Sequence, residues 1–171
     1  MARLTTTILL ATALVTTAAC SKKRPEVLPP APGEAPAETT GPTGPTEGAV
    51  VPGSSEDFKR SVTSDTVNFG LDQYDIDGTA RGILDSQVVW LQRYPNVRVT
   101  IEGHADERGT REYNLALGDR RANAAKNYLV ARGISPSRIT TISYGKERPL
   151  ALGSDEESWA RNRRAVTVVL N

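Results

Sequence analysis

Apolar and polar residues divide the chain into three zones. From Leu4 to Ala19 almost every residue is apolar or threonine, and from residue 22 to 56 large apolar residues are nearly absent. From residue 57 to 171 apolar residues recur at the spacings of strands and helices. The pattern therefore predicts a signal segment at 1–19, a linker at 20–56 and one folded domain at 57–171.

Within the third zone the periodicity predicts strands that alternate with helices. Val97, Val99 and Ile101 alternate with polar residues, which is typical of a half-buried strand. Between residues 111 and 132 small and apolar residues recur at helical spacing, and Gly133 is the expected stop. The expected elements are a strand at 66–69, a helix that Thr79 caps and Pro95 closes, a strand at 97–103, a helix at 111–132, a strand at 139–144, a short helix at 155–163 and a strand at 165–170.

This alternation predicts the fold class. It indicates an α/β (α+β) domain of βαβαβ type, in which helices pack on a mixed sheet of about four strands. About 115 residues are enough for a single hydrophobic core.

The N-terminal zone has the features of an export signal. Arg3 is its only charge, its apolar run is too short to span a membrane, and Ala18 and Ala19 supply the small residues of a cleavage site. The alternative, a buried helix, is disfavoured because the run has no polar face. Residues 25–52 are rich in Pro, Gly, Ala, Thr and Glu, so they predict a disordered, semi-extended tether.

Composition excludes several classes of function. The formal net charge is +1, which argues against a nucleic-acid partner. Cys20 is the only cysteine and His104 the only histidine, so an internal disulfide and a multi-histidine metal site are both excluded.

Candidate chemistry is concentrated in the segment from Glu102 to Gly109, between an expected strand and an expected helix. It carries charges of both signs, and Arg121 follows Asp106 by 15 residues on the helix. An arginine and an aspartate brought together in this way could bind a ligand that carries a carboxylate beside an ammonium. Spacing alone leaves open the alternative of a structural salt bridge between loop and helix.

Longer blocks of sequence resemble a known family. The blocks Glu102-Gly-His-Ala-Asp-Glu-Arg-Gly-Thr110, Tyr113-Asn114 and Leu117-Gly-Asp-Arg-Arg-Ala-Asn-Ala124 resemble the signature of the OmpA-like peptidoglycan-binding domain, in the version found in peptidoglycan-associated lipoproteins. Residues 69–76, 143–149 and 162–166 are similar to its other blocks. The resemblance covers about residues 64–171.

The resemblance implies a non-catalytic wall-binding module without a cofactor. The family binds peptidoglycan at meso-diaminopimelate of the stem peptide. By resemblance, Asp106 takes the ammonium of that residue and Arg121 its carboxylate. Asp72, Arg108 and Leu117 are expected to line the same pocket, and Asn114 is expected to hold the loop against the helix.

The upstream segment also resembles this family's layout. Cys20 is expected to be cut and diacylated as in a lipobox, and Ser21 after it implies the outer membrane, with the domain facing the periplasm. Family members also bind TolB of the Tol system and support envelope integrity and cell division, so we expect TolB and peptidoglycan to compete. Thr17 in the lipobox and Arg111 at the loop–helix junction depart from the family's pattern; Arg111 is expected to face solvent.

Other interpretations are weaker. His104, Asp106 and Glu107 form a poor metal-ligand set, and His104 is better explained as a loop residue that bonds to backbone. A hydrolase needs two carboxylates at a fixed separation or an activated nucleophile, and neither pattern is present. Trp90, Trp159 and Tyr128 could form a platform for sugars, but core packing is the expected use of all three. A module that binds TolB without binding the wall remains an alternative.

Overall fold

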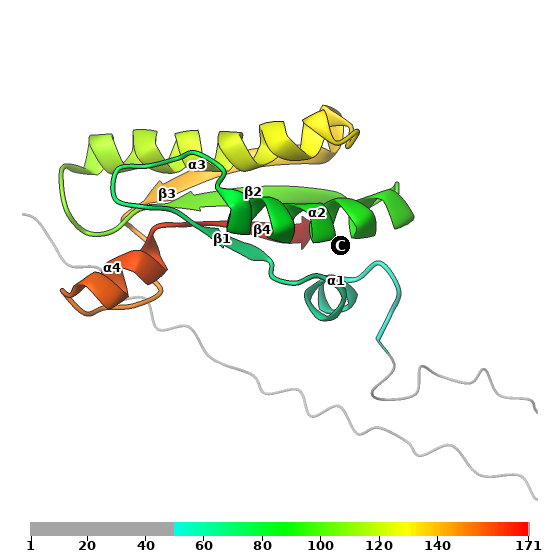
Figure 1. Ribbon diagram of the computed structural model, residues 1–171, viewed down its shortest axis with the longest axis horizontal. Helices are drawn as coiled ribbons and strands as arrows, with labels where there is room; N and C mark the ends of the chain where they lie inside the picture. The colour runs from blue at the N-terminus through cyan, green and yellow to red at the C-terminus, as the bar shows by residue number, and fades with distance from the viewer. Residues whose placement is uncertain (1–49, 171) are drawn as a thin grey trace, which may run out of the picture. The chain divides into compact units, whose positions relative to one another are not determined.

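The computed structural model describes residues 50–170, and these form a mixed sheet with helices (Figure 1). The elements in chain order are α1 (Ser55–Ser61), β1 (Thr66–Asn68), α2 (Gly78–Arg93), β2 (Arg98–His104), α3 (Arg111–Ala131), a 3₁₀ turn (Pro136–Arg138), β3 (Ile139–Gly145), α4 (Glu156–Asn162) and β4 (Arg164–Leu170). The sheet order is β1-β4-β2-β3. The fold class that the sequence predicts is confirmed.

The sheet mixes both directions of pairing. β2 runs parallel to β3 and antiparallel to β4, and β1 pairs antiparallel with β4. Val99 and Ile101 of β2 and Val169 of β4 are buried on the face that α2 and α3 cover, whereas Arg98 and Leu170 are exposed. The core therefore lies between one face of the sheet and two helices, and the ends of the strands lie outside it.

Side-chain caps fix where the helices begin. Ser54, Asp77, Thr110 and Asp155 each accept a hydrogen bond from a backbone N–H three residues later. The predicted cap at Thr79 is wrong, because Asp77 Oδ1 accepts from Ala80 N at 2.7 Å and the helix starts at Gly78. Gly133, at φ +93°, ends α3 as predicted, with Ile134 N donating to Leu129 O.

Helix α1 was not predicted, and the expected domain boundary at residue 57 falls inside it. Phe58 of α1 is buried and meets Trp90 of α2 edge-on, with ring centroids 4.9 Å apart. The indole Nε1 of Trp90 donates to Asp57 Oδ2 at 3.0 Å. These contacts join helix α1 to α2, so the folded part begins before residue 57.

The expectations for the N-terminal segments fall outside this description. The signal segment, Cys20 and most of the linker lie among residues that the structure does not describe. In the described part, from residue 50 to 170, none of the helices is both long and apolar enough for a membrane span.

Candidate functional site

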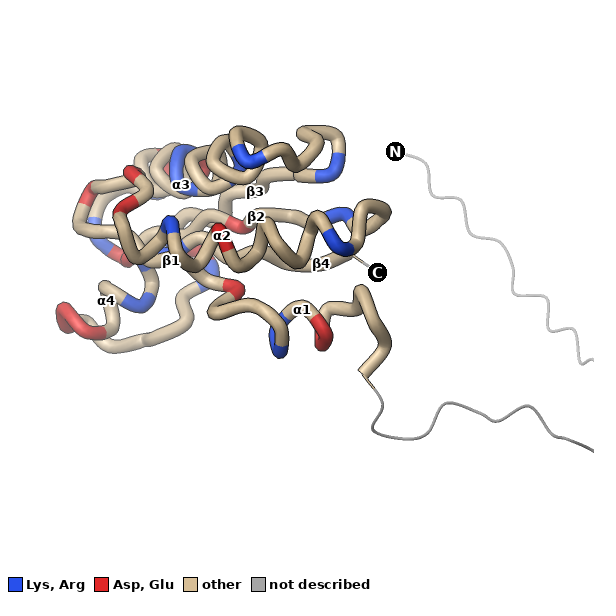
Figure 2. The backbone as a smooth tube through the Cα atoms, turned by 45° about the vertical axis from the view of Figure 1, so that its right-hand side comes forward, with Lys and Arg blue, Asp and Glu red and all other residues tan. Residues whose placement is uncertain are grey.

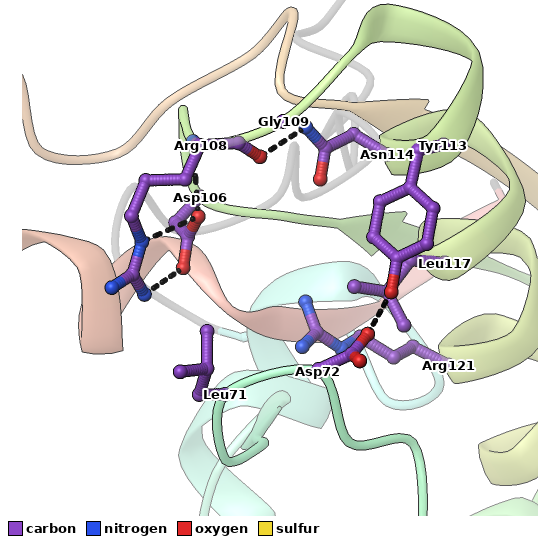
Figure 3. Close-up of a pocket in the computed structure, with 9 residues that line it drawn as sticks. All are labelled: Leu71, Asp72, Asp106, Arg108, Gly109, Tyr113, Asn114, Leu117 and Arg121. Carbon is purple, nitrogen blue, oxygen red and sulfur yellow. Dashed lines mark hydrogen bonds and ion pairs between the residues drawn. The ribbon is translucent and has the colours of Figure 1, made fainter.

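A pocket opens where β2 ends and α3 begins (Figure 3). Its volume is about 320 Å³, in the range of small-molecule sites. We call it the β2–α3 pocket; it is lined by Leu71, Asp72, Asp106, Arg108, Gly109, Tyr113, Asn114, Leu117 and Arg121. All six binding residues expected from the sequence are among them, so the structure brings together segments up to 49 positions apart (Asp72 to Arg121). What each residue does for a ligand stays a prediction.

Asp106 lies at the centre of a buried ionic cluster. Its Oδ1 accepts from the backbone N–H and Nε of Arg108, and its Oδ2 accepts from Arg108 Nη2 at 2.6 Å and Arg163 Nη1 at 3.4 Å. Burial alone would raise the pKa of the Asp106 carboxyl, but the hydrogen bonds and charge of Arg108 hold that pKa below its ordinary value. A carboxylate has about four acceptor sites, and Asp106 uses four within the protein.

Arg121 is fully buried and clamps three backbone segments. Its Nε donates to Gln73 O at 2.8 Å, its Nη1 to His104 O at 2.8 Å, and its Nη2 to Gly70 O at 3.1 Å. Burial lowers the pKa of Arg121 to about 10, and the charge of Asp106 opposes that shift, so the guanidinium stays charged at neutral pH. Three of its five N–H groups are used in this way, which leaves two without an acceptor among the described residues.

Asp72 supplies the exposed carboxylate of the pocket. Its backbone is left-handed, with φ +56°, a conformation that Asp and Asn tolerate better than most residues. The hydroxyl of Tyr113 donates to its Oδ1, and this bond raises the pKa of Tyr113. Among residues 50–170 no cation forms an ion pair with Asp72. It therefore keeps acceptor capacity that Asp106 lacks.

The loop between Ala105 and Thr110 is fastened from two sides. Asn114 Nδ2 donates to Arg108 O at 2.8 Å, and Lys146 Nζ donates to Glu107 O at 3.1 Å and Gly109 O at 2.7 Å. The wall of the pocket is thus held by α3 and by the end of β3 before any ligand arrives.

Trp159 was expected in the core, and that expectation is wrong. It is half-buried beside the pocket, with Arg108 Cζ 4.1 Å from its ring centroid and its Nε1 donating to Glu107 Oε1 at 3.0 Å. Trp90 is 2% exposed and Tyr128 packs against the core, so core packing is confirmed for these two.

Sequence reasoning missed three contributors to the site. Tyr113 and Leu71 line the pocket, and Arg163 pairs with Asp106 from 57 positions away. All three stand inside the sequence blocks that carried the family resemblance, which was the available signal. Arg111, expected to face solvent, is exposed but also pairs with Glu147, Nε to Oε1 at 3.2 Å.

His104 is not a loop residue, contrary to expectation. It is the last residue of β2 and is 2% exposed, and neither ring nitrogen has a hydrogen-bond partner within the described residues. Its backbone carbonyl accepts from Arg121 Nη1. Within residues 50–170 no three His, Cys, Asp or Glu side chains lie close enough together to hold a metal ion.

The buried imidazole predicts a loss of stability on acidification. Burial, with the nearby charges of Arg164 and Arg148, lowers the pKa of His104 from 6.5 to about 4, even though Glu102 lies 3.7 Å from Nε2. The neutral imidazole contributes to the stability of the folded protein above pH 6.5. This contribution is lost as the pH falls toward 4, because the unfolded chain binds the proton at a higher pH than the folded protein. We expect a loss of about 3 kcal/mol, measured by urea unfolding across that range. The free energy of unfolding of a His104→Gln variant should change less with pH over this range. The same pH dependence in both proteins would contradict this.

The fold and the pocket define a member of a known class. Residues 68–163 match the OmpA family, and the chain belongs to that family. It is 56% identical to the peptidoglycan-associated lipoprotein of Rhizobium meliloti (strain 1021) over 122 residues, which is 71% of this chain and 69% of that protein. The resemblance identified from the sequence is therefore confirmed.

Solved structures agree with this assignment. The crystal structure of the peptidoglycan-associated lipoprotein from Burkholderia pseudomallei is similar, with a TM-score of 0.63 and 39% identity over 67% of this chain and all of that one. The cell wall anchor of the T6SS from Pseudomonas aeruginosa has a TM-score of 0.53 and 26% identity over 62% of this chain and 80% of that one.

Proposed function

We propose that this protein is a non-catalytic anchor that binds peptidoglycan and tethers the outer membrane to the cell wall. Acylated Cys20 would hold it in the membrane, and the linker would let the domain reach the wall. Its relatives carry the name peptidoglycan-associated lipoprotein, which supports the wall as ligand. A place in the Tol system, with TolB competing for the same face, belongs to the proposal by family resemblance.

The observation that carries the proposal is the mixed charge of the β2–α3 pocket. Diaminopimelate ends in a carbon that bears both an ammonium and a carboxylate. Arg121 lines this pocket with two N–H groups that have no acceptor in the described chain, and the Asp72 carboxylate also lines it, with no cationic partner there (Figure 3). Charge-assisted hydrogen bonds to both groups would fix the ligand's orientation.

The geometry favours a different ammonium acceptor from the one expected by resemblance. Asp106 already accepts four hydrogen bonds from two arginines, so we assign the ammonium to Asp72. Asp106 then acts indirectly, because it holds Arg108 at the rim of the pocket. A site of modest affinity is sufficient, since many copies on one membrane face one polymer and bind multivalently.

Co-sedimentation with purified wall sacculi tests the proposal. The full-length protein in detergent should pellet with sacculi, and soluble diaminopimelate should release it. Asp72→Asn keeps a residue that tolerates the left-handed backbone and removes only the charge, so we expect binding to weaken about tenfold. Glu56→Gln on the exposed face of α1 is the matched control. A folded wild-type protein that stays in the supernatant would refute wall binding and leave the TolB-interaction alternative.

A further inference from the structure

A second hollow lies on the other side of the loop that bounds the β2–α3 pocket. It is lined by residues 68–70 at the end of β1, by Asp77 at the start of α2, and by Glu157, Ala160 and Arg161 of α4. We call it the β1–α4 hollow; its volume is about 480 Å³. Acidic and basic positions gather in this part of the molecule, around α4 and the neighbouring loops (Figure 2).

The walls of this hollow are fixed to each other. Asn68 Nδ2 donates to Ala160 O at 3.2 Å, and Phe69 N donates to Arg163 O at 2.9 Å. Arg163 Nε returns a bond to Phe69 O at 3.1 Å. The end of β1 and helix α4 therefore form a preformed cleft.

The charged side chains of the hollow form no ion pairs within residues 50–170. Glu157 and Arg161 are exposed and one turn apart on α4, and neither takes part in an ion pair or side-chain hydrogen bond within residues 50–170. Asp77 uses Oδ1 to cap α2, and its Oδ2 has no hydrogen-bond partner in the same part of the chain. Phe69, which is mostly buried, also lines the hollow. The hollow thus offers one guanidinium and two carboxylates beside an apolar residue.

Consecutive residues of one short loop line the hollow and the β2–α3 pocket. Gly70 lines the hollow, whereas Leu71 and Asp72 line the pocket. Two residues of chain reach at most about 7 Å, so a peptide of two or three residues would span from one to the other. The loop is held in place by Arg121, which donates to Gly70 O and Gln73 O.

We propose that the β1–α4 hollow is a second subsite for the wall peptide, in which Arg161 binds the terminal carboxylate of the stem whose diaminopimelate occupies the β2–α3 pocket. Glu157 and Asp77 would accept hydrogen bonds from the peptide's N–H groups. The proposal rests on the function proposed above and extends it, because it makes the protein sensitive to the chemical state of the peptide end.

Calorimetric titration of the full-length protein in detergent with three synthetic ligands tests this. The ligands are diaminopimelate, a stem tetrapeptide in which diaminopimelate is followed by an alanine with its carboxylate, and the same tetrapeptide ending in a carboxamide. Wild-type protein should bind the carboxylate form about fivefold more tightly than the carboxamide form, as expected for an exposed ion pair. Arg161→Ala should remove that difference and leave the affinity for diaminopimelate unchanged.

Arg98→Ala, at the exposed far end of β2, is the charge-matched control and should behave as wild type. Equal affinity of the wild type for both peptides, or an undiminished difference in Arg161→Ala, would overturn the second subsite while leaving the wall-binding proposal intact. Failure of all three ligands to bind would overturn both.

Discussion

Replacing Arg121 by lysine is expected to destabilise the protein by about 3–5 kcal/mol. The guanidinium reaches carbonyls on three separate stretches of backbone, those of Gly70, Gln73 and His104. One ammonium cannot satisfy three carbonyls in the same places, and each buried acceptor left without a donor costs about 1–3 kcal/mol. The 70–73 loop should then detach from α3 and the β2–α3 pocket should lose its shape, so wall binding should fall as well.

Urea unfolding of the two proteins, followed by circular dichroism, measures the effect. Arg120→Lys is the matched control, because Arg120 is the neighbouring residue on α3 but is exposed and lies over Tyr74, 5.7 Å from the ring centroid. That control should change stability by less than about 0.5 kcal/mol. An Arg121→Lys midpoint equal to that of wild type would show that the clamp does not stabilise the fold.

Gly103→Ala is expected to have the largest effect on folding of any single methyl addition we consider. A Cβ at Gly103 of β2 would lie 1.8 Å from the carbonyl oxygen of Gly118 and 2.6 Å from its carbonyl carbon. Both atoms belong to the backbone of α3, so no side-chain rotation relieves the clash. β2 and α3 would have to separate along the layer that forms the core, and we expect a loss of more than about 4 kcal/mol.

Thermal unfolding of Gly103→Ala beside Gly82→Ala tests the close contact. Gly82 is in the interior of α2, and a Cβ there meets nothing within 4 Å. Alanine is about 1 kcal/mol better than glycine inside a helix, so Gly82→Ala should raise the melting temperature slightly. Equal melting temperatures for Gly103→Ala and Gly82→Ala would show that α3 does not pack this closely on β2.

The elements with long periodic patterns could be predicted from the sequence. Helix α3 was expected at 111–132 and runs from Arg111 to Ala131, because its small residues recur over six turns and Gly133 ends it. Strands β2 and β3 were found to within one or two residues at each end. In these segments the local pattern and the tertiary packing favour the same structure.

Short elements and long-range partners could not be predicted in this way. Helix α1 has seven residues and buries only Phe58, so it leaves no periodic signal. Trp159 appeared to be a core residue, yet its position is set by Glu107 and Arg108, about 50 positions away. Spacing also could not show that Asp106 pairs with Arg163, because that contact depends on how α4 returns to the sheet.

No ion pair joins Asp106 to Arg121 among residues 50–170, so the salt bridge left open between these two residues is not formed. Asp106 pairs with Arg108 and Arg163 instead, and Arg121 holds three backbone carbonyls. For this reason substitutions of Arg121 cannot separate binding from stability, and the exposed Asp72 is the better probe. Ligand binding by Asp106 and Arg121 stays a prediction.

The central claim is that the β2–α3 pocket recognises an ammonium and a carboxylate on one carbon. Calorimetric titration with meso-diaminopimelate and with L-lysine, each acetylated on its main-chain amino group and amidated on its main-chain carboxyl group, tests this most directly, because the blocked lysine keeps the side-chain ammonium and has no carboxylate beside it. We predict measurable binding of the blocked diaminopimelate, at least tenfold weaker binding of the blocked lysine, and weaker binding of both ligands by Asp72→Asn, because both carry the ammonium. Equal binding of the two ligands by the folded protein would contradict the claim.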